Sequence, residues 1–421
     1  MLVLLTGATG FIGSHLAAAL LAQGHRVLAA GRKPCANPRI GFVLADLAHD
    51  TEKSQWLARL SGVDVVVNTV GIFRESHGQT FAALHSAGPR ALFAACADAG
   101  VQFVVQVSAL GADEDARTAY HRSKKEADDF LATLPLPSCI VMPSLVYGPN
   151  GASARLFRTV ATMPFVLRFG SAPQQVQPVH IDDVVAALAA LVAEAPACAR
   201  LPLVGPRAME FTDYLAALRS AMGLGRLRVL RLPEWLARLA ALLAARLPGS
   251  PLSPDALDML ARGNTADPRP LTVLLGRAPR DVASFIRHPR TERRVAQLGW
   301  LLPMLRASIA IVWIWTAIVS AFIYPAADSY ALLTRSGMPA AMAPLLLYGA
   351  SALDLAFGLG TLALPRRQRR WLWLAQLALI GFYSVLIAFK LPEFLYHPYG
   401  PLSKNLPMMA AIWLLYELER E

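Results

Sequence analysis

Residues 6–13 of this 421-residue chain read Thr6-Gly7-Ala8-Thr9-Gly10-Phe11-Ile12-Gly13. They follow a short apolar run, residues 2–5, and open a helix-like stretch that ends near Gly24. Glycine at these positions lets the backbone turn sharply and approach a pyrophosphate, whose negative charge meets the free N–H groups at the start of the helix. The pattern therefore predicts a dinucleotide site, rather than a purely structural turn, formed by Thr6, Gly7, Gly10, Phe11, Ile12 and Gly13.

Short apolar runs alternate with helical segments along the first half of the chain. Strand–helix–strand alternation predicts an α/β fold, a Rossmann-type parallel sheet wound on both faces. The expected strands are residues 2–5, 26–30, 41–44, 63–68, 101–108 and 138–142. From residue 152 to 223 the pattern is less regular, and we interpret this stretch as a small substrate lobe with helices at 182–194 and 212–222.

The end of the second expected strand bears on the choice of cofactor. An acidic residue there binds the adenosine ribose in NAD enzymes, whereas a basic residue accommodates the extra phosphate of NADP. This chain has Arg32 and Lys33 at that position and no acidic residue before Asp46. The sequence therefore favours NADP. NAD is the alternative, in which Arg32 stacks on the adenine or both basic side chains are simply solvated.

The spacing TGxxGxxG and four further segments resemble the extended and atypical short-chain dehydrogenase/reductase superfamily. The segments are Leu44-Ala45-Asp46-Leu47, Val67-Asn68-Thr69-Val70-Gly71, Tyr120-His121-Arg122-Ser123-Lys124 and Val179-His180-Ile181-Asp182-Asp183-Val184. The resemblance implies that Asp46 and Leu47 contact adenine and that Asn68 and Gly71 lie beside the cofactor. It also makes His180 a candidate residue on the substrate side.

Tyr120 and Lys124 are four residues apart, so on a helix they share a face. An ammonium close to a phenol favours the phenolate and lowers a pKa that starts at about 10. Tyr120 is then suited to exchange a proton with a carbonyl or alcohol oxygen while the nicotinamide exchanges a hydride. The resemblance also implies that Lys124 holds the cofactor ribose. The alternative is a retained helix face without turnover.

Ser108 ends the expected strand 101–108 and is the candidate for the catalytic serine of the superfamily. It lies 12 residues before Tyr120, a shorter spacing than in typical extended members. The superfamily segment Arg-Pro-x-x-x-Tyr-Gly is replaced here by Met142-Pro143-Ser144-Leu145-Val146-Tyr147-Gly148, in which Pro143 is expected near the cofactor. The loss of the arginine weakens any inference about sugar-nucleotide substrates.

The composition separates this chain from ordinary soluble proteins. Hydrophobic residues make up 55% and charged residues 16%, whereas soluble domains have about 45–50% and about 25%. Disorder is thereby excluded. The formal net charge is +11, and residues 226–306 alone hold 14 basic and 6 acidic side chains. Because that segment precedes the apolar half, we interpret the surplus as a cytoplasmic collar facing anionic lipid headgroups, not as a nucleic-acid footprint.

Three segments are apolar and long enough to cross a bilayer, which takes about 20 residues. They lie at residues 307–327, 336–365 and 371–389, and a fourth, 405–416, is short for a span. Four arginines at 366–370 follow the second segment, whereas the loop expected at 328–335 is nearly neutral. By the positive-inside rule, the arginine cluster and the nucleotide-binding half are both expected in the cytoplasm. The sequence thus predicts a multi-pass protein of the inner membrane that contacts the lipid bilayer.

The membrane half resembles the DoxX-like domain, which bacteria fuse to nucleotide-binding domains of this kind. The likeness is carried by Leu345-Leu346-Leu347-Tyr348-Gly349-Ala350 and by His397-Pro398-Tyr399-Gly400-Pro401-Leu402-Ser403-Lys404-Asn405-Leu406-Pro407. We therefore expect three domains. They are a nucleotide-binding domain with its substrate lobe (1–225), an Arg-rich extension and juxtamembrane linker (226–304), and a four-helix, all-α transmembrane domain (305–421).

Asp354 is the acidic residue within the second expected span. A carboxylate in the bilayer is costly and is by default a functional candidate that faces the interior of the helical bundle. Its expected partner is a basic residue such as Lys390 or Lys404, and the alternative is a neutral or hydrogen-bonded aspartate that fixes helix packing.

The nucleotide-binding half looks most like the atypical branch near the accessory subunit of respiratory NADH:ubiquinone oxidoreductase, whose members often bind NADPH and some of which have lost catalysis. With the membrane half, it predicts an NAD(P)H-dependent oxidoreductase at the cytoplasmic membrane face, acting on a lipid-soluble carbonyl or quinone-like substrate. The alternative is a non-catalytic dinucleotide-binding module that stabilises or senses within a membrane assembly. The four cysteines are too far apart in sequence for a metal knuckle or a redox CxxC, so we expect no metal, and they fit a reducing compartment.

Overall fold

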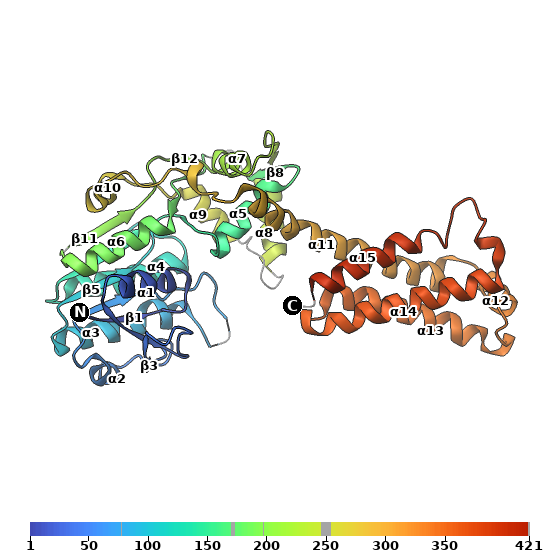
Figure 1. Ribbon diagram of the computed structural model, residues 1–421, viewed down its shortest axis with the longest axis horizontal. Coiled ribbons are helices and arrows are strands. Elements are labelled where there is room, and N and C mark those ends of the chain that lie inside the picture. Colours follow the sequence, from blue (N-terminus) through green and yellow to red (C-terminus); the bar gives the residue numbers. More distant parts are fainter. Residues whose placement is uncertain (77, 170–172, 197, 246–253, 420–421) are drawn as a thin grey trace. The chain divides into compact units, whose positions relative to one another are not determined.

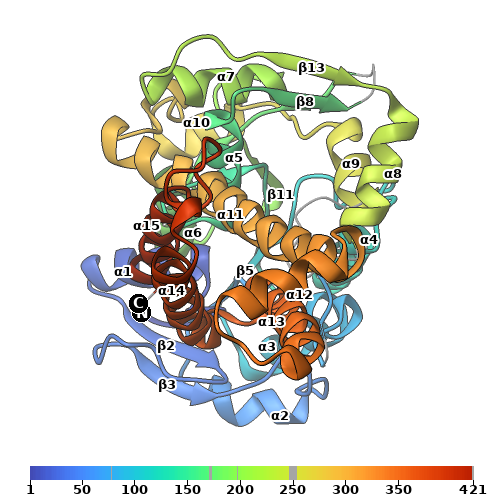
Figure 2. The same cartoon turned by 90° about the vertical axis from the view of Figure 1, so that its right-hand side faces the viewer.

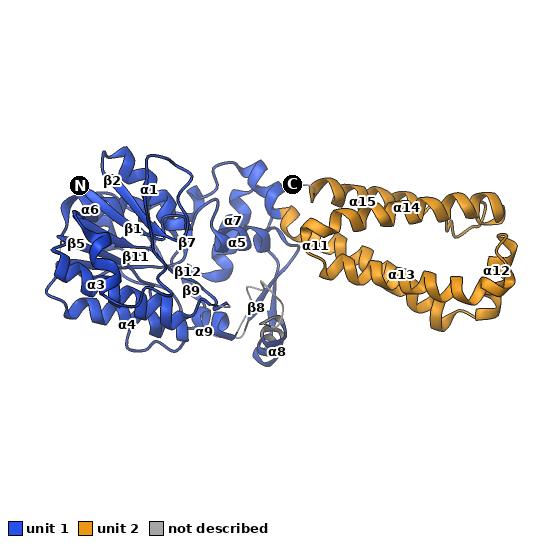
Figure 3. Cartoon of the chain, turned by 90° about the horizontal axis from the view of Figure 1, so that it is seen from below, with its two compact units in different colours: residues 1–296 blue, residues 297–421 orange. Residues whose placement is uncertain are grey.

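The structure, a computed structural model, describes residues 1–76, 78–169, 173–196, 198–245 and 254–419. They belong to two compact units, residues 1–296 and residues 297–421 (Figure 3). Unit 1 combines strands and helices, and unit 2 is helical. This confirms the predicted order of an α/β domain followed by an all-α domain.

Unit 1 is built on a seven-stranded parallel sheet with the order β11-β6-β5-β4-β1-β2-β3 (Figure 1). The strands are β1 (Leu2–Thr6), β2 (Arg26–Gly31), β3 (Gly41–Leu44), β4 (Val65–Asn68), β5 (Phe103–Val107), β6 (Ser138–Pro143) and β11 (Cys198–Leu203). The predicted Rossmann-type sheet is confirmed, with all six expected strands. The seventh strand, β11, was not expected.

Helices cover both faces of this sheet, which explains why its strands are apolar at nearly every position. The covering helices are α1 (Phe11–Ala22) and α6 (Ile181–Glu194) on one face, and α3 (Gly88–Ala99) and α4 (Ala119–Thr133) on the other. In β1, Val3 and Leu5 pack toward α1 and α6, whereas Leu4 packs into the opposite core. Parallel strands buried on both faces show this continuous apolar pattern instead of alternation.

The direction of winding reverses between β1 and β4, so the connections that leave these two strands diverge. Thr6 is paired with Asn68 in the register of the two strands. The glycine turn follows β1 directly, and α1 begins at Phe11. Because ligands of open parallel sheets bind at such a reversal point, the fold brings residues 6–13 to the edge where a dinucleotide is expected.

The part of unit 1 beyond the sheet contains short strand pairs and two helices that pack on each other. Its elements include β8 (Val166–Phe169), β9 (Gln175–Val176), β12 (Met209–Glu210), β13 (Val229–Leu232), α5 (Ala152–Thr162) and α7 (Phe211–Ala221). Strand β8 pairs in parallel with β13, and the two lie side by side in Figure 2. Because β13 comes from the Arg-rich segment, residues on both sides of position 225 build this lobe.

Helices of membrane length lie in the part of the chain that follows residue 288. In the described part of the chain, the helical stretches long and apolar enough to cross a membrane are Pro289–Ile323, Ala340–Ala363 and Arg366–Lys390. Their main helices are α11 (Pro289–Ile318), α13 (Ala343–Ala363) and α14 (Arg366–Lys390). The three predicted spans are therefore confirmed as membrane-length helices. The short fourth segment forms α15 (Asn405–Leu418), which has 14 residues.

The segment expected as a neutral loop at 328–335 is helical instead, because it forms most of α12 (Ala326–Arg335). It contains neither glycine nor proline. Pro325 precedes the helix, and Gly337, with a φ of +97°, follows its end. Proline before a helix and left-handed glycine after it are ordinary helix boundaries, and the sequence-based expectation overlooked both.

Charged residues from three parts of unit 2 meet at one end of it. Glu419, after α15, lies 3.0 Å from Arg369 Nε and 3.6 Å from Arg306 Nη1. Trp373 Nε1 also donates to Glu419 Oε2, at 3.1 Å. These contacts bring the start of the first apolar segment, the arginine cluster and the end of α15 together within unit 2. The side of the membrane on which they lie stays a prediction.

Candidate active site

The glycine turn after β1 has no room for side chains at two of its positions. Gly7 has a φ of +74°, and a Cβ there would lie 2.7 Å from Thr69 Oγ1. A Cβ on Gly13 would lie 2.2 Å from the carbonyl oxygen of Gly7. The helix α1 has Gly10 as its N-cap residue and begins with Phe11, Ile12 and Gly13. The leading N–H groups of a helix have no partner within it, so this cradle fits a dinucleotide pyrophosphate.

Buried polar side chains connect the ends of three neighbouring strands beside this turn. Thr6 Oγ1 donates to Asn68 Oδ1 at 2.6 Å, and Asn68 Nδ2 donates to Gln106 Oε1 at 2.7 Å. All three side chains are completely buried. Asn68 Oδ1 also accepts from the N–H of Val70 at 3.2 Å. The network therefore fixes the backbone that leads from β4 to Gly71.

The residues expected around the adenosine follow β2 and β3, at the same sheet edge. Arg32 and Lys33 are exposed. With the Gln79 amide oriented so that its oxygen faces Arg32, both terminal guanidinium nitrogens donate to that oxygen, at 2.5 and 2.8 Å. Leu47 is buried, and Asp46 Oδ1 accepts from a backbone N–H two residues further on, at 3.1 Å.

Tyr120 lies in the first turn of α4 and is surrounded by aromatic rings. It is 9% exposed. Phe73 stacks on it with 5.2 Å between the ring centroids, while Phe81 and His85 meet it edge-on. Phe73 itself is 79% exposed. The phenol ring is thus part of an aromatic cluster that reaches the surface through Phe73.

Lys124 lies one turn after Tyr120 on α4 and is 3% exposed. Its Nζ donates to the carbonyl oxygens of Val70 and Val107, at 3.0 Å each. A Cβ on Gly71 would lie 3.4 Å from this nitrogen. The ammonium therefore ties together the chain after β4 and the end of β5, beside the segment expected next to the cofactor.

Burial dominates the protonation of Tyr120 and Lys124. It raises the pKa of Tyr120 above the ordinary range, and the charge of Asp128 adds to this shift. Burial lowers the pKa of Lys124 to about 8, while the charge of Asp128 opposes that shift. The expectation that Lys124 lowers the pKa of Tyr120 differs from the structure, because the phenol is desolvated and Nζ is directed to two backbone carbonyls. A neutral phenol is the form that can donate a proton.

Ser108 follows β5, is buried, and donates its hydroxyl hydrogen to Asp128 Oδ2. Gln106 Nε2 donates to the other carboxylate oxygen at 3.3 Å. Burial raises the pKa of Asp128 to about 6, against the effects of Ser108 and Lys124. Asp128 was missed in the sequence, although the spacing of Tyr120, Lys124 and Asp128 by four residues places all three on one helix face.

His85 is a second residue that the sequence did not point to. It lies in the π-helix η2 (Ala82–Ala87) and is completely buried. Its Nε2 accepts from the N–H of Ile72 at 2.9 Å, and its Nδ1 is 3.1 Å from Ser123 Oγ, which donates to the carbonyl of Tyr120. Burial lowers the pKa of His85 to about 3. The neutral ring thus ties the chain after β4 to α4.

Pro143 and His180 contact the backbone around them. Pro143 ends β6, and its carbonyl accepts from the N–H of Leu110 at 3.0 Å. His180 is buried before α6, where its Nδ1 accepts from the N–H of Asp182 at 3.1 Å and its ring packs near Phe285. As placed, His180 caps a helix, and its candidate role toward a substrate stays a prediction.

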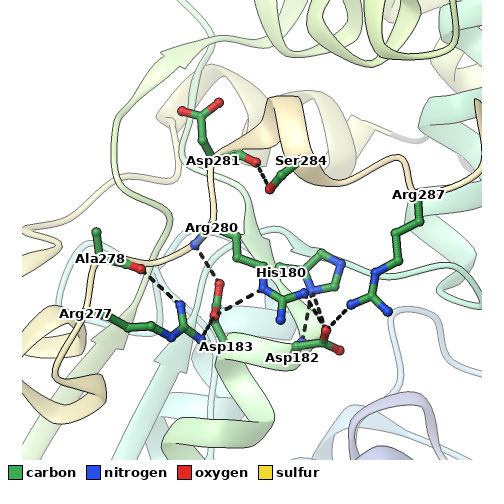
Figure 4. A network of polar contacts seen from close by, with 9 residues as sticks. All are labelled: His180, Asp182, Asp183, Arg277, Ala278, Arg280, Asp281, Ser284 and Arg287. Atoms are coloured by element: carbon green, nitrogen blue, oxygen red, sulfur yellow. Dashed lines mark hydrogen bonds and ion pairs between the residues drawn. The ribbon is translucent and has the colours of Figure 1, made fainter.

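The carboxylates at the start of α6 hold the Arg-rich segment, as Figure 4 shows. The completely buried Asp183 accepts from Arg277 Nη2 at 2.5 Å and from the N–H of Arg280 at 2.8 Å. Asp182 accepts from Arg280 Nη1 at 2.6 Å and from Arg287. These three arginines were expected in a collar facing lipid headgroups. They bind within unit 1 instead, because a buried carboxylate needs paired charge and donors.

Asp354 lies on the buried face of α13 in unit 2, the face that also carries Ser351 and Phe357. Among the residues that the structure describes, it forms no ion pair with Lys390 or Lys404, its expected partners. The interior position agrees with the sequence-based expectation for an intramembrane carboxylate. Its function stays a prediction.

Comparisons with known proteins agree with this geometry. The NAD dependent epimerase/dehydratase family matches residues 3–199, and the DoxX-like family matches residues 310–413. A ceramide reductase from Caulobacter vibrioides is 30% identical over 241 residues, which are 55% of this chain and 74% of that protein. The mitochondrial NADH dehydrogenase (ubiquinone) 1 alpha subcomplex subunit 9 of Arabidopsis thaliana is 26% identical over 193 residues, 44% of this chain and 48% of that protein.

Solved structures share the fold at lower identity. A nucleoside-diphosphate-sugar epimerase from Staphylococcus aureus gives a TM-score of 0.56 at 16% identity, covering 68% of this chain and 100% of that structure. A UDP-glucuronic acid 4-epimerase from Bacillus cereus, solved with NAD, gives 0.51 at 19% identity, covering 72% and 100%. At these identities the likeness establishes the fold alone.

The family matches confirm both resemblances found in the sequence. The matched residues 3–199 include the glycine turn, Ser108, Tyr120 and Lys124, so the cofactor is an NAD(P) dinucleotide by family. The chain is therefore an enzyme of the NAD dependent epimerase/dehydratase family, with a DoxX-like domain fused to its nucleotide-binding unit.

Proposed function

We propose that this enzyme uses NADPH to reduce a ketone group of a long-chain membrane lipid to an alcohol. The observation that carries the proposal is the convergence of the dinucleotide turn, Ser108, Tyr120 and Lys124 at one edge of the sheet. The described part of the chain also has three helices of membrane length, which would keep the enzyme where such a lipid is dissolved.

Each side chain of the site has a role in this proposal. NADPH, when bound on residues 7–13, supplies the hydride to the carbonyl carbon. Tyr120 donates its phenolic proton to the substrate oxygen as the alcohol forms. Ser108 hydrogen-bonds the same oxygen. Lys124 holds the ribose and, through its bonds to Val70 and Val107, keeps the two strand ends in register.

The substrate class rests on two supports. One relative is named for the reduction of ceramide, and a hydride plus a proton turns a ketone into a hydroxyl group. The second support is the aromatic cluster around Tyr120, because the exposed Phe73 and the neighbouring Phe81 offer apolar contact to an alkyl chain. A quinone-like acceptor would use the same contacts, and the experiment below separates the two.

NADPH is proposed over NADH from the residues after β2. Arg32 and Lys33 are exposed there, and no carboxylate precedes Asp46 to accept the ribose hydroxyls. A guanidinium suits the extra phosphate of NADP because it donates two parallel hydrogen bonds. With its oxygen turned toward Arg32, the Gln79 amide accepts from both terminal nitrogens, which supports the idea that these donors can converge on one acceptor.

We further propose the domain division 1–225, 226–304 and 305–421, with the nucleotide-binding domain on the cytoplasmic side of the inner membrane. The arginine cluster at 366–370 supports this side. The disulfide between Cys139 and Cys198 is the opposing observation and argues for an oxidising compartment, since disulfides are rare in the cytosol.

Thiol labelling of intact cells and inverted vesicles decides the side. Arg367 is exposed at the start of α14, so in a Cys35→Ser background an Arg367→Cys variant provides an accessible thiol. An impermeant maleimide is expected to label it in inverted vesicles and not in intact cells. Labelling in intact cells would place the cluster, and the proposed site, outside the cytoplasm.

The activity is tested with the full chain in lipid nanodiscs, by following NADPH oxidation with a long-chain ketone, with a quinone and with a membrane-lipid extract. Tyr120→Phe is expected to lower turnover of the ketone by about 10²–10⁴-fold, the usual contribution of a general acid. Tyr214→Phe is the matched control, because Tyr214 is completely buried in α7 and its hydroxyl has no hydrogen-bond partner among the described residues.

Three outcomes would contradict the proposal. Tight NADPH binding without oxidation of NADPH by any lipid fraction would favour a module that binds the dinucleotide without turnover. Turnover of the quinone alone would replace the ketone as substrate. A Tyr120→Phe variant as active as wild type would remove the tyrosine from the chemistry.

A further inference from the structure

Asp128 occupies an unusual position for a charged group, between α4 and the end of β5. Its side chain is completely buried. One carboxylate oxygen accepts from Ser108 Oγ and the other accepts from Gln106 Nε2, at 3.3 Å. Gln106 is in turn held by Asn68, so Asp128 ends the buried polar network that begins at Thr6 beside the glycine turn.

The bond between Ser108 and Asp128 restricts what the serine can offer to a substrate. A hydroxyl group has one hydrogen and two lone pairs. An ionised carboxylate can only accept hydrogen bonds. Ser108 must therefore donate its one hydrogen to Asp128, and only its lone pairs remain to face a substrate oxygen. A carbonyl oxygen needs a donor. When Asp128 is protonated, it donates to Ser108 Oγ, and the serine hydrogen becomes free for the carbonyl.

We propose that Asp128 is a positioning residue whose protonation sets the direction of the Ser108 hydroxyl, which donates to the substrate carbonyl only when Asp128 is neutral. The inference rests on the proposed carbonyl reduction and adds a dependence of that reaction on pH. The hydride still comes from NADPH and the proton still comes from Tyr120. The proton on Asp128 is not consumed, because it only redirects the hydrogen bond of Ser108.

The charges around Asp128 are few. Lys124 on the same helix and Arg200 on β11 favour its ionised form, but desolvation outweighs them and raises its pKa to about 6. The charge of Asp128 also contributes to the raised pKa of Tyr120, which lies two turns away on the same helix.

The other elements packed on α4 offer little further charge to Asp128. Among the described residues, further titratable or charged groups in contact with the helix are His85 of η2, which contacts Ser123, and Arg90 of α3, which lies over the ring of Phe130. Glu114 pairs with Lys125, Arg200 pairs with Asp129, and the charges of Arg262 and Asp113 act on His121. With a pKa of about 6, Asp128 changes its protonation state within the range of pH at which the enzyme can be assayed.

The test is the pH dependence of ketone reduction by the full chain, compared between wild type and Asp128→Asn. An amide with its nitrogen toward Ser108 and its oxygen toward Gln106 is a permanent donor to the serine, so the substitution imitates the protonated aspartate. Wild-type kcat is expected to fall about tenfold per pH unit above pH 6, by up to about 10²-fold, the cost of losing one donor to the substrate oxygen. Asp128→Asn is expected to keep the low-pH rate at pH 8.

Two further variants make the comparison specific. Ser108→Ala is expected to be slow at every pH and to lose the step near pH 6, because no hydroxyl remains to be redirected. Glu126→Gln is the matched control, since Glu126 is an exposed carboxylate on the same helix. It is expected to keep the wild-type profile. An Asp128→Asn variant with the wild-type fall, or a fall that persists in Ser108→Ala, would overturn the proposal.

The failure of the proposed function would look different. If wild type turns over no ketone, infrared titration of the NADPH-bound enzyme still reports on Asp128 through its protonated carboxyl band. That band is expected to titrate near pH 6, to vanish in Asp128→Asn and to shift in Ser108→Ala. An unshifted band in Ser108→Ala would show that the serine does not respond to Asp128.

Discussion

Gly13→Ala tests whether the glycine turn is the cofactor cradle. The added methyl group would lie 2.2 Å from the carbonyl oxygen of Gly7 and 2.8 Å from its carbonyl carbon, whereas real Cβ contacts stay above 3.0 Å. The turn and α1 must therefore separate by nearly 1 Å. Overpacking of this kind lowers the free energy of unfolding by about 1–3 kcal/mol. The better helix propensity of alanine offsets about 1 kcal/mol of this loss. We expect a net loss of up to about 2 kcal/mol.

The same displacement moves the N–H groups that face the pyrophosphate. If the strain destabilises the conformation of the turn that binds the cofactor by about 1.4 kcal/mol, the Kd for NADPH rises about tenfold. The assay is calorimetric titration of the full chain in detergent with NADPH. Gly225→Ala is the control, since a Cβ at Gly225 meets nothing within 4 Å. Wild-type affinity in Gly13→Ala would refute the cradle.

Three further perturbations test the NADP site, the protonation of Asp128 and the charged end of unit 2. Arg32→Ala is expected to weaken NADPH binding about 10–100-fold and to leave NADH unchanged, because only the charge-assisted bonds to the extra phosphate are lost, and nucleotide titrations measure this. The folded-state pKa of Asp128, about 6 against an ordinary 3.8, makes a stabilising contribution that is complete below about pH 4 and lost as the pH rises through 6. Asp128→Asn should therefore match wild type in thermal unfolding at pH 4 and exceed it by up to roughly 3 kcal/mol at pH 8; an equal advantage at both values would contradict the linkage. Glu419→Gln leaves Arg306 and Arg369 without their shared carboxylate and is expected to destabilise unit 2 by about 3 kcal/mol, read from its unfolding in detergent.

Features encoded in contiguous residues could be predicted from the sequence. The glycine turn at 6–13 and the apolar strands need only local pattern, because a parallel strand buried on both faces is apolar throughout. Strand β11 was missed for the same reason. Its sequence, Cys198–Leu203, contains an arginine and a proline, and its place beside β6 depends on a pairing across the sheet.

The candidate site was only partly predictable. The spacing of Tyr120 and Lys124 places them on one face of α4 whatever surrounds the helix. The protonation of Tyr120 could not be predicted, because it depends on desolvation and on the direction of the Lys124 ammonium. Asp128 continues the same spacing, but its partner Ser108 follows β5, and no local rule pairs them.

The positions of the arginines in the segment 226–306 could not be predicted from their number. The arginines of the segment 226–306 were assigned together to the membrane surface. Arg277, Arg280 and Arg287 are instead used by the carboxylates at the start of α6. A net charge does not identify the partner of any one side chain. The fold determines whether an arginine faces lipid or a buried aspartate.

In the proposed reaction, a hydride passes from the nicotinamide to a lipid ketone at a site where Tyr120 supplies the proton. This reaction is tested most directly by giving the full chain in nanodiscs NADPH that carries deuterium on C4 of the nicotinamide, together with a long-chain ketone, and by analysing the lipid alcohol by mass spectrometry. We expect an alcohol that carries the deuterium on its carbinol carbon with wild type, and almost no such alcohol with Tyr120→Phe. Unlabelled alcohol, or equal labelling with Tyr120→Phe, would contradict the proposed reaction.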